Sequence, residues 1–123
     1  SANQTINQST ITIVEWDVVS ADPGSNYNTS TFQYTTPFTG LYDIRTILHW
    51  NNSSDRRLTY IYINNVEATL VYAVDGQSHT PYSVILSLTA GDTIDVRCEQ
   101  TFQFSMQVRD GITHFTVNYM GPV

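Results

Sequence analysis

The sequence predicts an all-β fold, a two-layer antiparallel sandwich of about eight to ten short strands. Three observations predict this fold. Apolar and polar residues alternate along most of the chain, as they do in a strand with one buried face. No long stretch repeats apolar positions at the three- and four-residue spacing of a helix. Turn-forming residues interrupt the chain at the short, regular intervals that are typical of sandwiches and barrels.

The alternation is clearest in four segments, which we predict to be half-buried strands: residues 40–50, 93–100, 101–110 and 113–120. The apolar members of each segment share one face and form the predicted core. They are Tyr42, Ile44, Leu48, Trp50, Ile94, Val96, Cys98, Phe102, Phe104, Met106, Val108, Phe115, Val117 and Tyr119. Thr46 is the polar exception on the core face of the first segment.

Two further segments, 58–63 and 68–74, are apolar on both faces. We expect strands that are covered on both sides or that lie inside an assembly. The dipeptide Asn64-Asn65 stands between them, and both residues tolerate the positive φ that a tight hairpin turn needs. Asp110-Gly111 predicts a second hairpin before the last strand.

The length and charge of the chain exclude several classes of protein. A chain of 123 residues supplies one core, and we predict one domain at 10–123 behind a polar lead-in at 1–9. No apolar run approaches the ~18 residues of a transmembrane helix, so we expect no membrane insertion. The net charge of −6 argues against binding nucleic acid, whose phosphate backbone is negative. The single cysteine excludes an internal disulfide.

The residues from 16 to 42 have a spacing that is more specific than that of a generic sandwich. The aromatic and small residues that carry it are Trp16, Asp22, Tyr27, Tyr34, Gly40 and Tyr42. A second segment at 83–94 has the sequence SVILSLTAGDTI. Both segments resemble the signature of the complement C1q globular head, a jelly roll shared with tumour necrosis factor. Ile44, Thr46 and Val117 depart from that signature, which has Phe, an aromatic residue and Gly at these positions.

The resemblance extends over residues 14–120 and includes Phe115, which matches the Phe of the family's last strand. It implies a jelly roll that forms a homotrimer, often at the end of a fibrous or collagenous stalk. Domains of this family bind partners and do not catalyse reactions, so the resemblance implies a protein that is not an enzyme. Some members bind calcium near the trimer axis.

The polar face of the segment 40–50 indicates where the subunits of such a trimer would meet. We expect the polar face of 93–100 to lie beside it, so that Asp–Arg pairs fix the register between subunits. The candidate trimer interface consists of Asp43, Arg45, Ile47, His49, Asp95, Arg97 and His114. The alternative is an ordinary solvated sheet face.

The predicted loops carry the candidate ligand-binding residues. Amide, carboxylate, guanidinium and tyrosine side chains gather there, and these groups suit sugar hydroxyls or a protein epitope. The candidates are Tyr27, Asn51, Asn52, Asp55, Arg56, Asp75, Gln77, His79 and Tyr82. The alternative is that these are ordinary hydrophilic turns.

The sequence offers no catalytic or metal-binding motif. His49, His79 and His114 have no partner at a metal-ligand spacing, and the eleven carboxylates include no pair that stands out as an acid–base pair. Cys98 alternates with apolar core residues and is interpreted as a core residue. We therefore expect no catalytic site and no cofactor. Calcium stays an open alternative, because loop Asp and Asn oxygens suit it although no loop has the spacing of a dedicated site.

These observations lead to one functional hypothesis and two alternatives. The hypothesis is a trimeric recognition or adhesion tip of a longer fibre-like protein, either a phage tail fibre or a bacterial surface adhesin. Its loops would bind a glycan or protein at a cell surface, and it would be located outside the cell, at the cell surface or on a virion. The alternatives are a structural trimerisation cap and a secreted signalling ligand of the tumour necrosis factor type. The first ten residues have no signal-peptide pattern, as expected for one domain of a longer protein. A small protein stays open as the alternative.

Overall fold

The computed structural model describes residues 3–16, 24–51, 55–73, 79–108 and 114–123. Within these residues it contains eleven β-strands and no helix, which confirms the predicted all-β fold. Six strands are long: β5 (Gly40–His49), β6 (Arg57–Ile63), β7 (Val66–Ala73), β8 (His79–Leu88), β9 (Thr93–Gln100) and β11 (His114–Gly121). Five are short: β1 (Gln4–Ile6), β2 (Thr12–Ile13), β3 (Tyr27–Asn28), β4 (Gln33–Thr35) and β10 (Met106–Val108).

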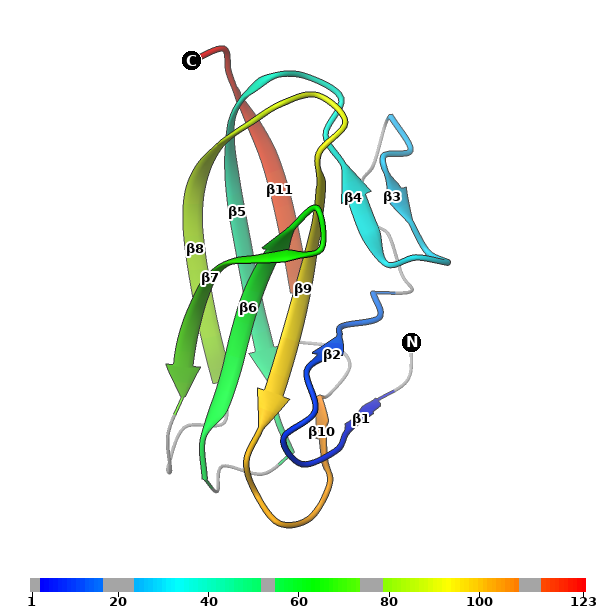
Figure 1. Cartoon of the computed structure of the whole chain (residues 1–123), viewed down its shortest axis with the longest axis vertical. Coiled ribbons are helices and arrows are strands. Elements are labelled where there is room, and N and C mark those ends of the chain that lie inside the picture. Colours follow the sequence, from blue (N-terminus) through cyan, green and yellow to red (C-terminus); the bar gives the residue numbers. More distant parts are fainter. Residues whose placement is uncertain (1–2, 17–23, 52–54, 74–78, 109–113) are drawn as a thin grey trace.

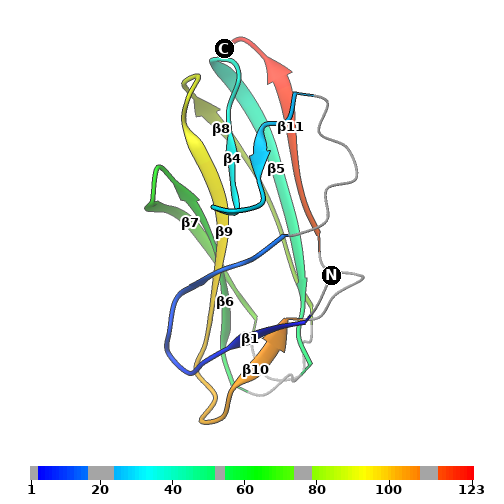
Figure 2. The same cartoon turned by 90° about the vertical axis from the view of Figure 1, so that its right-hand side faces the viewer.

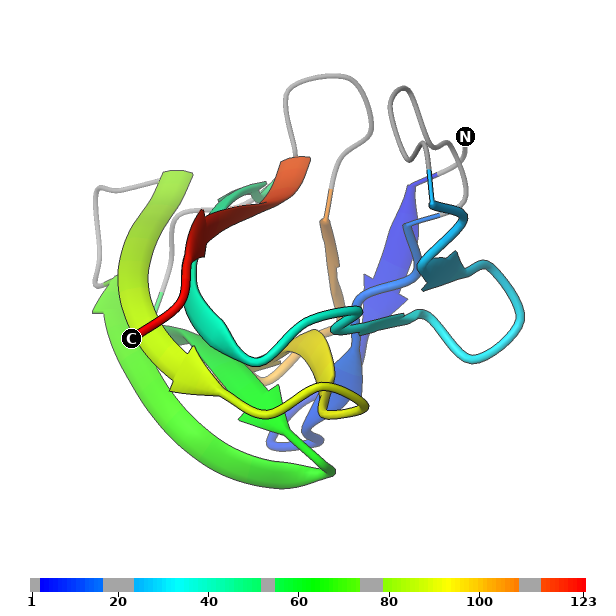
Figure 3. The same cartoon turned by 90° about the horizontal axis from the view of Figure 1, so that it is seen from above.

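The strands form two main antiparallel sheets (Figure 1). One sheet has three strands in the order β11-β5-β8, and the other has six, in the order β3-β4-β9-β6-β7 with β2 paired along β9. Seen along the long axis, the sheets curve around a common interior, with β7 and β8 side by side at one flank (Figure 3). The two-stranded β1–β10 sheet crosses the lower part of the molecule (Figure 2). The architecture is therefore the predicted two-layer sandwich.

The core lies between the two sheets and follows the predicted alternation. On β5 the side chains of Tyr42, Ile44 and Leu48 are fully buried. On β9 the same holds for Val96 and Cys98. Because successive side chains leave opposite faces of a strand, one face of each sheet builds the core and the other is left for different contacts.

The turn between β6 and β7 is the predicted hairpin. Asn64 and Asn65 have φ values of 52° and 65°, which are the left-handed conformations of a tight hairpin turn. The hairpin places β7 at the edge of the six-stranded sheet, where it pairs with β6 alone. Within one chain the second segment is not covered on both sides, because Ala68 is exposed on this edge strand. The alternative, that this strand lies inside an assembly, stays a prediction.

The strand predicted at 101–110 is wrong in its first half, because residues 101–105 form a loop and strand structure begins at Met106. The reason is the fully buried side chain of Gln100. Its Nε2 donates to the backbone oxygen of Phe104 (2.9 Å), and its Oε1 accepts from the backbone N–H of Phe102 (2.6 Å). These two bonds wind the chain around the Gln100 amide and end the alternation. The hairpin predicted at Asp110-Gly111 lies outside the described residues.

The polar lead-in contributes to the core. Residues 4–6 form β1, which pairs antiparallel with β10, and Ile6 is fully buried. Gln100 Nε2 also donates to the backbone oxygen of Ile6 (3.1 Å), so the same buried amide holds the lead-in and the 101–105 loop together.

Candidate functional site

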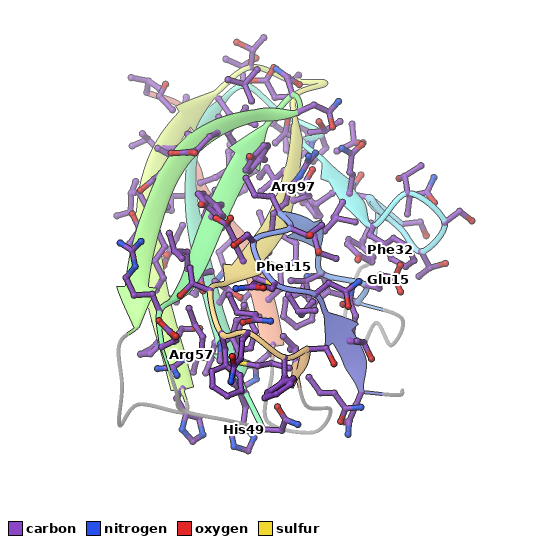
Figure 4. The ribbon with its side chains drawn as sticks, turned by 60° about the horizontal axis from the view of Figure 1, so that its bottom comes forward. Glu15, Phe32, His49, Arg57, Arg97 and Phe115 are labelled. Atoms are coloured by element: carbon purple, nitrogen blue, oxygen red, sulfur yellow. The ribbon has the colours of Figure 1, made fainter. Side chains whose placement is uncertain are left out.

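One end of the sandwich, at the bottom of Figure 1, gathers several of the predicted loop residues. β5 ends there at His49, and β6 begins there at Arg57 (Figure 4). β8 begins at the same end, because His79 pairs with His49, and the 101–105 loop follows β9 there. We call the described residues of this region the loop end. They are Asn51, Asp55, Arg56, His79 and 101–105.

Thr101 fixes two loops of the loop end to each other. Its backbone N–H donates to the backbone oxygen of Arg56 (3.0 Å), and its hydroxyl accepts from the Arg56 N–H (3.1 Å). The same hydroxyl donates to Asp55 Oδ1 (3.1 Å). Asn51 is held separately, because its N–H and Oδ1 bond to the backbone of Gln107 (3.0 and 2.9 Å). The backbone positions of these residues are thus set by hydrogen bonds rather than by regular secondary structure.

The structure brings together four of the predicted ligand-binding residues, namely Asn51, Asp55, Arg56 and His79. Asn52, Asp75 and Gln77 lie outside the described residues. The two tyrosines, which were predicted in loops, lie in strands instead. Tyr82 lies within β8 opposite Thr46, packs against the core and shares a hydroxyl–hydroxyl hydrogen bond with Thr69. Tyr27 lies in β3, paired with Tyr34 and packed edge-on against Phe115 at a centroid distance of 6.3 Å.

Sequence reasoning missed one exposed residue of the loop end. Phe102 and Phe104 were both predicted in the core, but only Phe102 packs against the core cluster, and the side chain of Phe104 is 65% exposed. The two rings contact each other edge-to-face at 5.7 Å. The alternation of the sequence gives no signal for this arrangement, because it depends on the hydrogen bonds of Gln100.

A second surface is the outward face of the three-stranded sheet, which we call the three-stranded face. Cross-strand pairs place Asp43 of β5 between Ile85 and Asn118, and Ile47 between Pro81 and His114. Five of the seven predicted interface residues therefore share this face: Asp43, Arg45, Ile47, His49 and His114. Ile85 is 55% exposed in their midst, and the sequence analysis did not single it out.

Two contacts within one chain order the polar side chains of the three-stranded face. Arg45 pairs with Asp43 on its own strand, with Nη2 at 3.0 Å from Oδ2. This carboxylate raises the pKa of Arg45 through a hydrogen bond and through its charge. The imidazole rings of His49 and His79 stack at 4.4 Å with 9° between their planes. The face therefore presents a pre-oriented ion pair beside apolar side chains.

Asp95 and Arg97 do not belong to this surface, so the predicted juxtaposition is wrong. They lie on β9, which is a strand of the other sheet and does not pair with β5. Asp95 is fully buried there and accepts from Arg97 Nε (2.8 Å) and from Gln33 Nε2 (3.0 Å). The Arg97 guanidinium also covers the ring of Tyr62 at 4.1 Å and donates to Asn65 Oδ1 (2.9 Å). The pair is a closed network within one chain, because β4, β6 and the hairpin supply its partners.

The comparison with known families decides the identity of the fold. The family model for the C1q domain matches residues 1–116 of the chain. The chain belongs to the C1q domain family. Such domains are generally trimeric recognition or signalling modules without enzymatic activity, and they typically occur in secreted or extracellular proteins. The sandwich is therefore a C1q jelly roll, as the resemblance implies. A comparison with curated proteins gives no match.

The structure explains the aromatic spacing of this C1q domain. Trp16 stacks on Phe115 at 5.8 Å, and Tyr27 meets the same ring, so signature positions far apart in sequence converge on the last strand. The position of Thr46, where the family has an aromatic residue, is flanked on the core face by Phe115 and Tyr82 of the neighbouring strands. Aromatic rings from β8 and β11 thus fill the space beside the small residue.

Two further reactive groups of the C1q domain, those of Cys98 and Asp92, have structural roles. Burial raises the pKa of the Cys98 thiol, so the thiolate that a nucleophile needs is disfavoured. Asp92 is a turn residue: it accepts from Asn64 Nδ2 (2.9 Å) and from the Thr89 N–H (2.9 Å), which lowers its pKa. Across the ranges that the structure describes, no three His, Cys, Asp or Glu side chains cluster to fit calcium or another metal. The same ranges hold no helix able to cross a bilayer.

Proposed function

We propose that this C1q domain is the recognition or adhesion tip of a fibre-like protein of a phage or bacterium, and that it works as a homotrimer. The observation that carries the proposal is that the domain has two surfaces of different character, which adjoin at the stacked rings of His49 and His79. The loop end gathers hydrogen-bonding side chains of three separate segments, and the three-stranded face presents apolar side chains beside an ordered ion pair. One surface is thus available for binding a target while the other is used for assembly.

The three-stranded face suits assembly because it has exposed apolar side chains and also charged side chains that can set the register between subunits. Ile85 is exposed on β8, and the partly exposed Ile47 lies two rows away. The Asp43–Arg45 pair between them provides one acidic and one basic group, which favour one register of association over others. Three such faces meeting around an axis would also place three loop ends side by side, so that weak individual sites gain strength on a repetitive target surface.

The assembly prediction is tested with Ile85→Asp. The new carboxylate would be desolvated in the subunit contact without a partner, so we expect the trimer to dissociate. Light scattering on a sizing column is expected to give three times the chain mass of 13.9 kDa for the wild type and one chain mass for the variant. Val66→Asp is the matched control, because Val66 is an equally β-branched residue, 67% exposed on the edge strand of the other sheet. A monomeric wild type would refute the trimer.

The binding prediction is tested with Arg56→Ala. The backbone of Arg56, rather than its side chain, makes the bonds to Thr101, so the loop is expected to keep its shape. Loss of a charged hydrogen-bond donor from a binding site is expected to weaken binding at least about fivefold. The measurement is binding of the labelled trimer to a panel of bacterial and animal cells and to a glycan array. Glu67→Ala, an exposed charge on β7, serves as the control. A trimeric wild type that binds neither cells nor glycans would indicate the trimerisation cap instead.

A further inference from the structure

Phe104 is exposed although the same loop has another phenylalanine in the core. Single exposed apolar residues are common on proteins and need no explanation by themselves. Here, however, the exposed ring contacts a second ring, and the backbone that carries it is bonded to a buried side chain. Phe102 is anchored against the core, and its ring contacts Phe104 edge-to-face at 5.7 Å. The backbone oxygen of Phe104 itself accepts from the buried Gln100 amide at 2.9 Å.

The loop that carries Phe104 is fixed at its first residue, Thr101, by hydrogen bonds to two other segments. Thr101 is bonded to the backbone of Arg56 and to the carboxylate of Asp55, and Gln8 Nε2 donates to the Thr101 oxygen (3.3 Å). An aromatic side chain that is ordered before binding loses little conformational entropy when a ligand covers it. The backbone of the loop is thus fixed by hydrogen bonds, while the flat apolar ring of Phe104 is exposed to the solvent.

The loop end that carries this ring also holds polar groups of the kinds that recognise hydroxyls. The loop that carries the ring is bonded directly to Asp55 and Arg56, and Gln103 is exposed within it. A carboxylate accepts hydrogen bonds, a guanidinium donates them, and an amide does both. One exposed aromatic ring on the same loop end as a few such groups is the composition of a small-ligand site, whereas a stable protein interface needs roughly 800 Å² on each partner.

The charge of the molecule indicates the class of small ligand. The chain carries a net charge of −6. Thr101 bonds to the carboxylate of Asp55 and to the backbone of Arg56, so one acidic and one basic residue are bonded to this loop. An anionic ligand would be repelled by the protein as a whole without a compensating basic cluster at the site. A neutral ligand with apolar faces and hydroxyl edges fits both the ring and the charge balance.

We propose that Phe104 is the stacking platform of a binding site for a neutral glycan, with Asp55, Arg56 and Gln103 forming hydrogen bonds to the hydroxyls of the sugar that covers the ring. This inference rests on the proposed recognition function and names its ligand class. The C–H groups on one face of a pyranose ring would lie against the face of the phenyl ring.

The test uses the full chain and a glycan array of defined composition. The array carries neutral oligosaccharides that end in glucose, galactose, mannose or N-acetylglucosamine, together with sialylated and sulfated counterparts. We expect the wild type to bind a neutral glycan and Phe104→Ala to weaken that binding at least about tenfold. Phe104→Tyr keeps the ring and is expected to stay within about threefold. Phe38→Ala is the matched control, because Phe38 is 57% exposed beside Gly40, at the opposite end of β5.

The outcomes separate this inference from the proposed function. If the wild type binds cells but no neutral glycan, or if Phe104→Ala binds the glycan as the wild type does, the inference is wrong and the recognition function stands. If the wild type binds neither cells nor glycans, both are wrong. Light scattering and thermal unfolding of Phe104→Ala complete the test. A variant that no longer forms the wild-type oligomer would show that Phe104 serves assembly, which would also overturn the inference.

Discussion

Gly40→Ala is expected to destabilise the domain by at least about 3 kcal/mol and to yield little folded protein. A Cβ atom at this position would lie 2.3 Å from the backbone oxygen of Gly121 and 2.8 Å from the ring of Tyr119. The first neighbour is backbone and cannot rotate away. Gly40 begins β5 next to the pairing of Leu41 with Gly121, so the clash would separate β5 from β11 at that end of the three-stranded sheet.

The clash would also disturb the next signature residue. The Tyr42 hydroxyl donates to the backbone oxygen of Phe38 (2.6 Å) and accepts from its N–H (3.1 Å), which closes the turn that leads into β5. Thermal unfolding and expression yield measure the effect. Gly91→Ala is the matched control: Gly91 also has a positive φ, of 95°, but a Cβ there meets nothing within 4 Å. We expect Gly91→Ala to cost about 1 kcal/mol. Equal stability of the two variants would refute the explanation.

Arg97→Met is expected to lower the free energy of unfolding by about 3 kcal/mol, more than Asp95→Ala does. The side chain of Asp95 is 1% exposed, so removal of Arg97 leaves a buried carboxylate whose remaining side-chain donor is Gln33. The side chain of Arg97 is 23% exposed. After removal of Asp95 it keeps Asn65 Oδ1, the ring of Tyr62 and access to water.

The double variant Asp95→Ala/Arg97→Met distinguishes the loss of the ion pair from the cost of leaving one buried charge without its partner. It leaves no buried charge, so we expect it to be more stable than Arg97→Met alone. Urea unfolding at one fixed protein concentration is the measurement, because the stability of an oligomer depends on concentration. If the double variant lowers the free energy of unfolding by the sum of the two single effects, the two residues act independently. Light scattering is expected to show unchanged assembly, since this network lies on the sheet away from the three-stranded face.

Most of the predicted core follows from the period of the sequence. Tyr42, Ile44 and Val96 are buried as predicted, because the alternation of a strand is a local property that the chain carries in its own order. The hairpin at Asn64-Asn65 was predictable for the same reason, since it requires two adjacent residues that tolerate positive φ.

The strand that the alternation predicts at 101–110 is wrong where a buried polar side chain redirects the backbone. Phe104 continues the pattern of a strand, and residues 101–108 contain no Gly, Pro, Asn or Asp that would indicate a turn. The loop exists because Gln100 satisfies backbone groups of Phe102 and Phe104 from inside the core. The hydrogen-bond partners of a buried amide depend on which groups the folded chain packs around it, so the sequence alone does not indicate them.

The sequence by itself determined the class of fold, the inward face of each long strand, the family resemblance and the acidic character that disfavours anionic partners. These are properties of composition and of neighbours along the chain. Only the tertiary structure decided that β9 lies in the sheet opposite β5, which removes Asp95 and Arg97 from the three-stranded face, and that Phe104 reaches the solvent. The pairing of strands is set by contacts between distant segments, and an alternating pattern reveals which side of a strand is buried but not which strand lies beside it.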